Sequence, residues 1–106
     1  MAGGDSDEAT RLLGAAASLL EAVGADRDRV PGRVAADCRV AAALLWRAGG
    51  LPQPAVVHAA DPGATIREAM TALSKLSDAQ LSSAPTMTAV QIIWRVFLRI
   101  GRPHSP

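Results

Sequence analysis

Apolar residues recur every three or four positions along most of this chain, and Gly, Pro and short polar turns interrupt the pattern. The first stripe predicts a helix over 6–23, with Asp5 as its cap, Glu8 completing a capping box and Gly24 following its last turn. The inward positions of this helix are Ala9, Leu12, Leu13, Ala16, Ala17, Leu19, Leu20 and Val23.

A second helix is predicted after a polar turn. Asp28 is placed to cap it, so that Pro31 falls in the first turn, where the missing N–H of proline does no harm. The helix ends near Ala48, because Gly49-Gly50 and two later prolines prevent its continuation. Its inner face consists of Val30, Val34, Cys38, Ala41, Ala42, Leu44, Leu45 and Ala48.

Asp37 carries a charge inside the apolar arc of this second helix. An unpaired buried carboxylate is costly, so we expect it to form an ion pair. Arg33, four residues earlier on the same helix, is the local candidate, and Arg95 and Arg99 are the distant ones. We therefore predict a structural ion pair between Arg33 and Asp37.

The third helix has a strong start signal, because Asp61 can cap it and Pro62 suits its first position. Its apolar stripe is narrow, which is typical of a helix packed on one side only. The helix is expected to end near 75. A second capping-box signature at Ser77 predicts a short helix over 78–82.

The last predicted helix, 86–100, is apolar over most of its circumference. Its polar residues fall on a narrow arc that contains Gln91, Arg95 and Arg99, with Arg102 just beyond. This stretch is too short to cross a membrane. We therefore expect the helix to lie in the middle of the fold or to be covered on one face by another chain.

These elements predict an all-α protein, a small antiparallel four-helix bundle formed by one domain over 1–106. We expect residues 1–4 and 102–106 to be disordered. Additional short helices are considered near 55–60 and 78–82. If both form, the alternative is a six-helix globule of the size of death-like adaptor modules, a comparison that depends on helix count alone.

Composition narrows the functional classes. The net charge of +1 does not suit binding to nucleic acid through bulk charge. Many alanines and only three aromatic residues favour closely packed helices without a roomy cofactor pocket. The single cysteine, Cys38, and the lack of a signal-peptide pattern lead us to expect a cytoplasmic protein.

Candidates for catalysis and metal binding are few. His58, His104 and Cys38 have no metal-ligand spacing, so no metal or cofactor is expected. His58 and Asp61 lie three residues apart in the long connection, where functional loops often occur. A small-ligand or enzymatic domain around these two residues is therefore kept as one alternative.

A helix-turn-helix is the other alternative. Ala59 and Gly63 have the four-residue offset of this motif, with 55–60 as the first helix, 61–64 as the turn and 65–76 as the recognition helix. The near-neutral charge and Pro62 in the turn disfavour DNA binding.

The preferred interpretation is a non-enzymatic protein–protein interaction module, such as a dimeric adaptor, assembly factor or accessory subunit. The helix 86–100 has two apolar strips, with Ile92, Val96 and Ile100 on one and Trp94 and Leu98 on the opposite one. We expect one strip to lie in the core and the other to meet a partner, and a two-fold homodimer is the commonest way to cover such a strip. The three arginines of this helix and its tail could select an acidic partner, and a tryptophan on the second helix could be a further anchor. The predicted interface residues are Ile92, Val96, Ile100, Arg95, Arg99, Arg102 and Trp46.

Overall fold

The computed structural model describes the backbone of residues 2–53 and 61–101 and, within these ranges, the side chains from 7 to 100. Helices account for most of this part of the chain, and it contains no strand, so the all-α prediction is confirmed. The elements are α1 (Ala2–Ala25), α2 (Gly32–Arg47), α3 (Pro62–Ser74), α4 (Asp78–Leu81), α5 (Ala84–Val96) and a π-helical turn, η1 (Phe97–Gly101).

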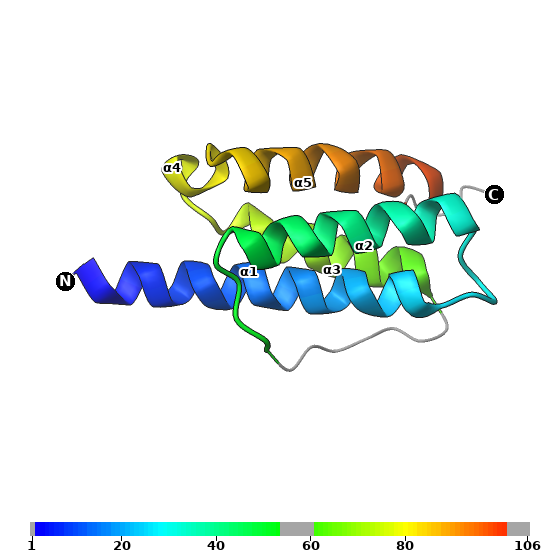
Figure 1. Ribbon diagram of the computed structural model, residues 1–106, viewed down its shortest axis with the longest axis horizontal. Helices are drawn as coiled ribbons and strands as arrows, with labels where there is room; N and C mark the ends of the chain where they lie inside the picture. Colours follow the sequence, from blue (N-terminus) through cyan, green and yellow to red (C-terminus); the bar gives the residue numbers. More distant parts are fainter. Residues whose placement is uncertain (1, 54–60, 102–106) are drawn as a thin grey trace.

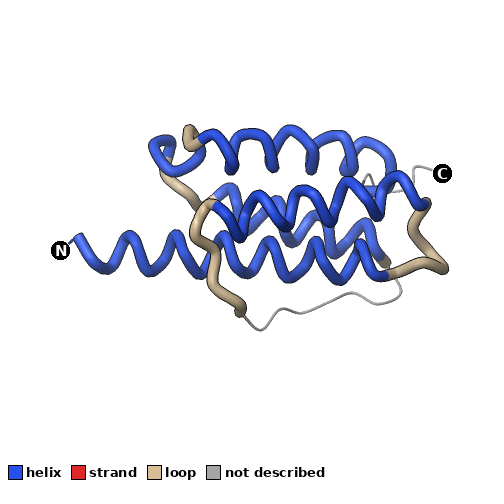
Figure 2. The backbone as a smooth tube through the Cα atoms, viewed as in Figure 1, coloured by secondary structure: helices blue, strands red, loops and turns tan. Residues whose placement is uncertain are grey.

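The four long helices of this part lie side by side (Figure 1). α1 packs on α2 and α3, while α5 packs on α2 and reaches α3 mainly through η1. α1 and α5 run in one direction and α2 and α3 in the other, so each helix is antiparallel to both of its neighbours (Figure 2). The seam between α1 and α2 therefore lies on the opposite side of the molecule from the seam between α3 and α5. The segment 55–60, on which the six-helix alternative depends, lies outside the described residues.

Side chains from all four long helices form one apolar core. Burial of these side chains is the main source of stability in a domain of this size. Almost the whole core is aliphatic, which agrees with the low aromatic content of the chain. The largest fully buried apolar side chains are Leu20, Val34, Leu45, Ile66, Ile93 and Val96.

The first two helices begin elsewhere than predicted. α1 starts at Ala2, so the backbone of 2–4 is helical and Asp5 lies inside the helix instead of capping it. α2 starts at Gly32 after Pro31, and Asp28 does not cap it. Asp26 is used in the preceding turn, where its carboxylate accepts a hydrogen bond from the Arg29 N–H at 3.0 Å and pairs with the Arg29 guanidinium at 3.7 Å. The chain therefore turns at 26–29 before α2 can begin.

The predicted starts of the next two helices are confirmed. The Asp61 carboxylate accepts a hydrogen bond from the Ala64 N–H at 3.0 Å, and Pro62 is the first residue of α3. At α4, the Gln80 N–H donates to the Ser77 hydroxyl at 3.3 Å and the Ser77 N–H donates to the Gln80 side chain at 2.8 Å. Both caps satisfy N–H groups that lack partners within the helix.

The connection that leaves α2 crosses α1 at a glycine. Gly49 has a φ of 113°, a conformation that favours glycine, and the following Gly50 N–H donates to the Leu45 carbonyl at 3.1 Å. The chain then passes over α1, where a Cβ on Gly14 would collide with the Leu51 carbonyl. This close contact fixes the start of the long connection on the surface of α1.

The C-terminal end of α5 widens into η1, whereas the sequence predicted a regular helix to 100. η1 packs directly on α3, and a Cβ on Gly63 would collide with the Ile100 carbonyl. The glycine in the first turn of α3 is therefore required by close backbone packing.

Candidate functional site

The two apolar strips of α5 have opposite environments. Ile92 and Val96 are only 8% and 1% exposed, and Ile100 is half-buried against the core. The structure thus corrects the predicted contact strip, because these residues pack inside their own subunit. Thr86 and Ala89 lie on the same inner face, and their small side chains allow the neighbouring helices to approach α5 closely.

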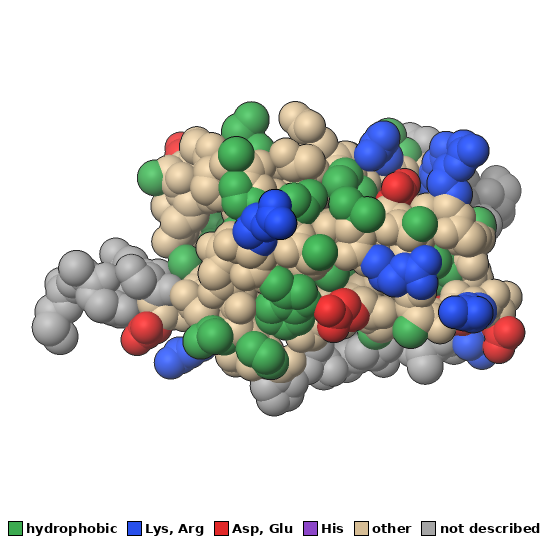
Figure 3. All heavy atoms as spheres, viewed as in Figure 1, with side chains coloured by type: hydrophobic (Ala, Val, Ile, Leu, Met, Phe, Trp, Pro, Cys, Tyr) green, Lys and Arg blue, Asp and Glu red, His purple; other side chains and the backbone are tan. Residues whose placement is uncertain are grey.

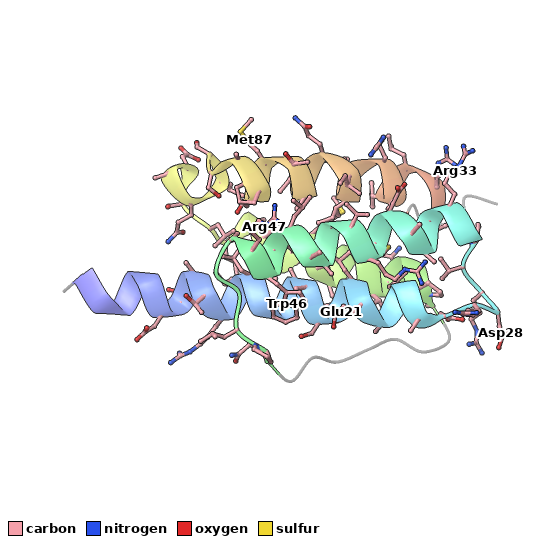
Figure 4. All side chains as sticks on the ribbon, in the orientation of Figure 1. Glu21, Asp28, Arg33, Trp46, Arg47 and Met87 are labelled. Carbon is pink, nitrogen blue, oxygen red and sulfur yellow. The ribbon has the colours of Figure 1, made fainter. Side chains whose placement is uncertain are left out.

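The outer face of α5 and η1 carries three large apolar side chains, which we call the α5 stripe; Met87 and Trp94 lie in α5 and Leu98 lies in η1. Met87, Trp94 and Leu98 are 49%, 51% and 54% exposed and follow helical spacing. Met87 points away from the other helices (Figure 4). The Trp94 ring packs edge-to-face on Phe97, with 5.5 Å between the ring centroids, which orients the indole.

An apolar groove lies beside the α5 stripe, between α3 and α5. It has a volume of about 210 Å³, which is small compared with the roughly 300–1,000 Å³ of small-molecule pockets. Trp94 belongs to both the groove and the α5 stripe, so the two form one continuous surface. Such a surface suits the side chains of a docked helix. The groove is lined by Met70, Leu73, Ser74, Leu81, Val90, Ile93 and Trp94.

Basic residues flank the α5 stripe at its C-terminal end. Arg95 and Arg99 are exposed, and neither takes part in an ion pair within residues 7–53 and 61–100. Arg102, the third predicted basic contact, lies outside the described residues. This end of α5 therefore presents positive charge to solvent.

Trp46 lies on the other side of the molecule. Its Nε1–H donates to the Glu21 carboxylate at 2.7 Å, and this hydrogen bond joins α2 to α1 (Figure 4). The half-buried indole therefore belongs to the α1–α2 seam and does not extend the α5 stripe.

The predicted pair of Arg33 and Asp37 does not form an ion pair in the described part of the chain. Arg33 is exposed at the start of α2, and Asp37 is half-buried. The neighbouring Cys38 is fully buried. Burial, and to a smaller extent the charge of Asp37, raises the pKa of the Cys38 thiol to about 12. Such a thiol is not a nucleophile near neutral pH.

Two residues of the alternative sites, His58 of the proposed ligand site and Ala59 of the helix-turn-helix, lie outside the described residues. Asp61 caps α3 and also pairs with Arg67 at 3.8 Å. Residues 62–64, which the helix-turn-helix interpretation needs as a turn, are the first turn of α3, and Gly63 packs against the Ile100 carbonyl. The turn predicted for a DNA-binding motif is therefore not present there.

Comparisons with known proteins do not extend these observations. No family model matches the chain, and neither the curated proteins nor the solved structures contain a match. Within the described residues, no group of three or more His, Cys, Asp or Glu side chains could hold a metal ion. No helix in the same ranges is both long enough and apolar enough to span a membrane.

The sequence pattern identified the helix that carries the candidate surface, but the apolar interface residues predicted on it lie on its inner strip. Met87, Trp94 and Leu98 form the outer strip, and no residue of α3 or α4 was predicted to contribute. One signal was available, since Ala89 and Thr86 share a face with Ile93 and small residues often mark the close-packed side of a helix.

Proposed function

We propose that this protein is a non-enzymatic interaction module that forms a two-fold dimer through the α5 stripe and the adjoining groove. The observation that carries the proposal is the half-exposure of Met87, Trp94 and Leu98 on the outer face of α5 and η1, beside an apolar groove. Single exposed apolar residues are ordinary, whereas several exposed apolar side chains on one face beside an apolar groove are typical of contact sites.

The size of the surface sets the expected affinity. Covering three half-exposed side chains contributes on the order of 1 kcal/mol each, to which the groove adds. One helix face and one groove fall short of the roughly 800 Å² per partner that standard interfaces bury. We therefore expect a dimer that dissociates on dilution.

Charge selects the relative direction of the two α5 helices. In a parallel pair, Arg95 and Arg99 of one subunit would lie beside their own copies, and like charges about 4 Å apart repel by about 1 kcal/mol even in water. In an antiparallel pair, they lie beside the N-terminal half of the partner helix, where Thr88 and Gln91 are uncharged. The antiparallel dimer is therefore the one we propose.

Light scattering over a concentration series tests this proposal. The wild-type mass should rise from 10.9 kDa toward twice that value, and Leu98→Glu should remain at 10.9 kDa throughout, because it places a charge in the contact. Leu51→Glu is a closely matched control. Leu51 is 57% exposed, compared with 54% for Leu98, and it lies over α1, away from α5. It should dimerise as the wild type does.

Two results would contradict the dimer. A wild-type mass of 10.9 kDa at every concentration would show that the α5 stripe does not pair with itself. Equal losses of mass in Leu98→Glu and Leu51→Glu would show that any added charge disturbs association, so that α5 has no special part in it. Circular dichroism of each variant establishes that the helices are retained.

An acidic amphipathic helix of another protein is a second occupant for the same surface. Arg95 and Arg99 favour it, because both are exposed and take part in no ion pair with the described residues. Salt distinguishes the two occupants. Contact with an acidic helix weakens as salt rises, whereas dimerisation through the α5 stripe changes little.

A further inference from the structure

A concave surface lies along the seam between α1 and α2, on the opposite side of the molecule from the groove between α3 and α5. It consists of two adjoining hollows, with volumes of about 470 Å³ and 400 Å³. Gly24, Arg27 and Arg39 line both of them. Each volume lies within the roughly 300–1,000 Å³ range of small-molecule sites.

Small residues let α1 and α2 approach closely along this surface. A Cβ on Gly24 would lie 2.8 Å from Cγ of Arg39 and 3.1 Å from the Ala35 carbonyl oxygen, so glycine here lets the Arg39 side chain lie across the seam. Ala25 and Ala43 continue the lining of the larger hollow. The lining therefore combines small residues with the longer side chains of Arg27 and Arg39.

The larger hollow has an indole on its wall. Trp46 lines it together with Glu21, and the 2.7 Å hydrogen bond between their side chains holds the ring in place (Figure 4). The Glu21 carboxylate keeps its negative charge but lines only the larger hollow, so an anionic group is better placed in the smaller hollow, which Arg27 and Arg39 line. A half-buried aromatic ring in a fixed position can pack against a flat group of a ligand.

Two guanidinium groups are available in the same place. Arg27 and Arg39 are exposed, and neither forms an ion pair with a described residue. The nearby Asp26 is already occupied by Arg29. Basic side chains gather at this end of the molecule, over the end of α1 and the start of α2 (Figure 3). Guanidinium groups bind phosphate and carboxylate through paired hydrogen bonds.

We propose that the α1–α2 seam binds a small organic phosphate with a flat ring, its phosphate on Arg27 and Arg39 and its ring beside Trp46. Phosphate is favoured over carboxylate because its three terminal oxygens can serve both guanidinium groups, whereas the two oxygens of a carboxylate are satisfied by one. The ring accounts for the presence of the indole in the larger hollow.

Fluorescence of Trp46 reports on the site directly. The Trp94→Phe variant leaves Trp46 as the sole tryptophan, and its emission is followed during titration with phenyl phosphate, inorganic phosphate and benzoate. We expect a saturable change with phenyl phosphate and at least tenfold weaker binding of the other two. Adding Arg27→Gln or Arg39→Gln should weaken binding of phenyl phosphate at least tenfold.

Arg47→Gln is the matched control. Arg47 is exposed beside Trp46 in the sequence but lines neither hollow, so its loss should leave the titration unchanged. The absence of a saturable change, or equal effects of Arg39→Gln and Arg47→Gln, would overturn the site. Equal affinity for phenyl phosphate and inorganic phosphate would overturn the part assigned to Trp46. Unchanged circular dichroism establishes that each variant is folded.

Discussion

At the scale of single residues, Cys38 shows how complete burial changes the chemistry of a side chain. Its thiol lies at the centre of α2's inner face, where the sequence pattern placed it as a small apolar residue. The raised pKa follows from this position, because the thiolate would have to exist without water and beside the charge of Asp37. Cys38 therefore couples the stability of the fold to alkaline pH.

The free energy of unfolding should fall as the pH rises above 9. The unfolded thiol ionises near its ordinary pKa of 9.0, whereas the folded one keeps its proton up to about 12. The unfolded state therefore binds fewer protons in this window, and stability declines by up to about 1.4 kcal/mol per pH unit. Urea unfolding at pH 7, 9 and 10 measures the effect, and Cys38→Ala is the reference. The idea is wrong if the difference between wild type and Cys38→Ala stays constant with pH.

At the scale of elements, local chemistry explains which helix starts were predictable. Asp61 and the Ser77 box act through residues three positions away, so the sequence contains everything that these caps need. Asp28 is also of a residue type that caps helices, but it does not cap α2. The chain first turns at 26–29, where Asp26 accepts a hydrogen bond from the Arg29 N–H, and α2 begins only after Pro31. η1 is π-helical and packs against α3, which is distant in the sequence, so the local sequence pattern could not predict its form.

Asp61 contributes to α3 in two ways that substitution can separate. Asp61→Ala removes both the cap and the pair with Arg67, and it should lower the unfolding free energy by about 1–2 kcal/mol. Asp61→Asn keeps a capping oxygen and loses only an exposed pair, so its loss should be below about 1 kcal/mol. Urea unfolding of both variants gives the comparison. Equal losses would show that the charge, and not the cap, is what α3 requires.

At the scale of the whole molecule, α5 shows most clearly what the sequence alone could not predict. Its apolar residues cover both strips about equally, so the pattern could not say which strip faces the core. That choice depends on the positions of α2 and α3, which are distant in the chain from α5. The all-α class follows from local periodicity, whereas the exposed surface follows from the tertiary arrangement.

The contact of η1 with α3 joins segments far apart in the sequence and can be tested at Gly63. Gly63→Ala should destabilise the fold by about 1–3 kcal/mol, because its Cβ would collide with the Ile100 carbonyl. Gly32→Ala is the control, since a Cβ there meets nothing within 4 Å. It should be neutral or stabilise α2 by up to about 1 kcal/mol. Thermal or urea unfolding distinguishes them, and a stable Gly63→Ala protein would show that α3 and η1 are not closely packed in solution.

The antiparallel neighbour order also bears on how the chain is made. The helices that pack on α5, α2 and α3, precede it in the sequence and are synthesised before it. Their apolar surfaces therefore stay exposed until α5 has been synthesised. The α5 helix of a second molecule can also pack on these surfaces. Two molecules caught at this stage could exchange α5, each completing the core of the other, and α4 with its short flanking turns would then serve as the hinge.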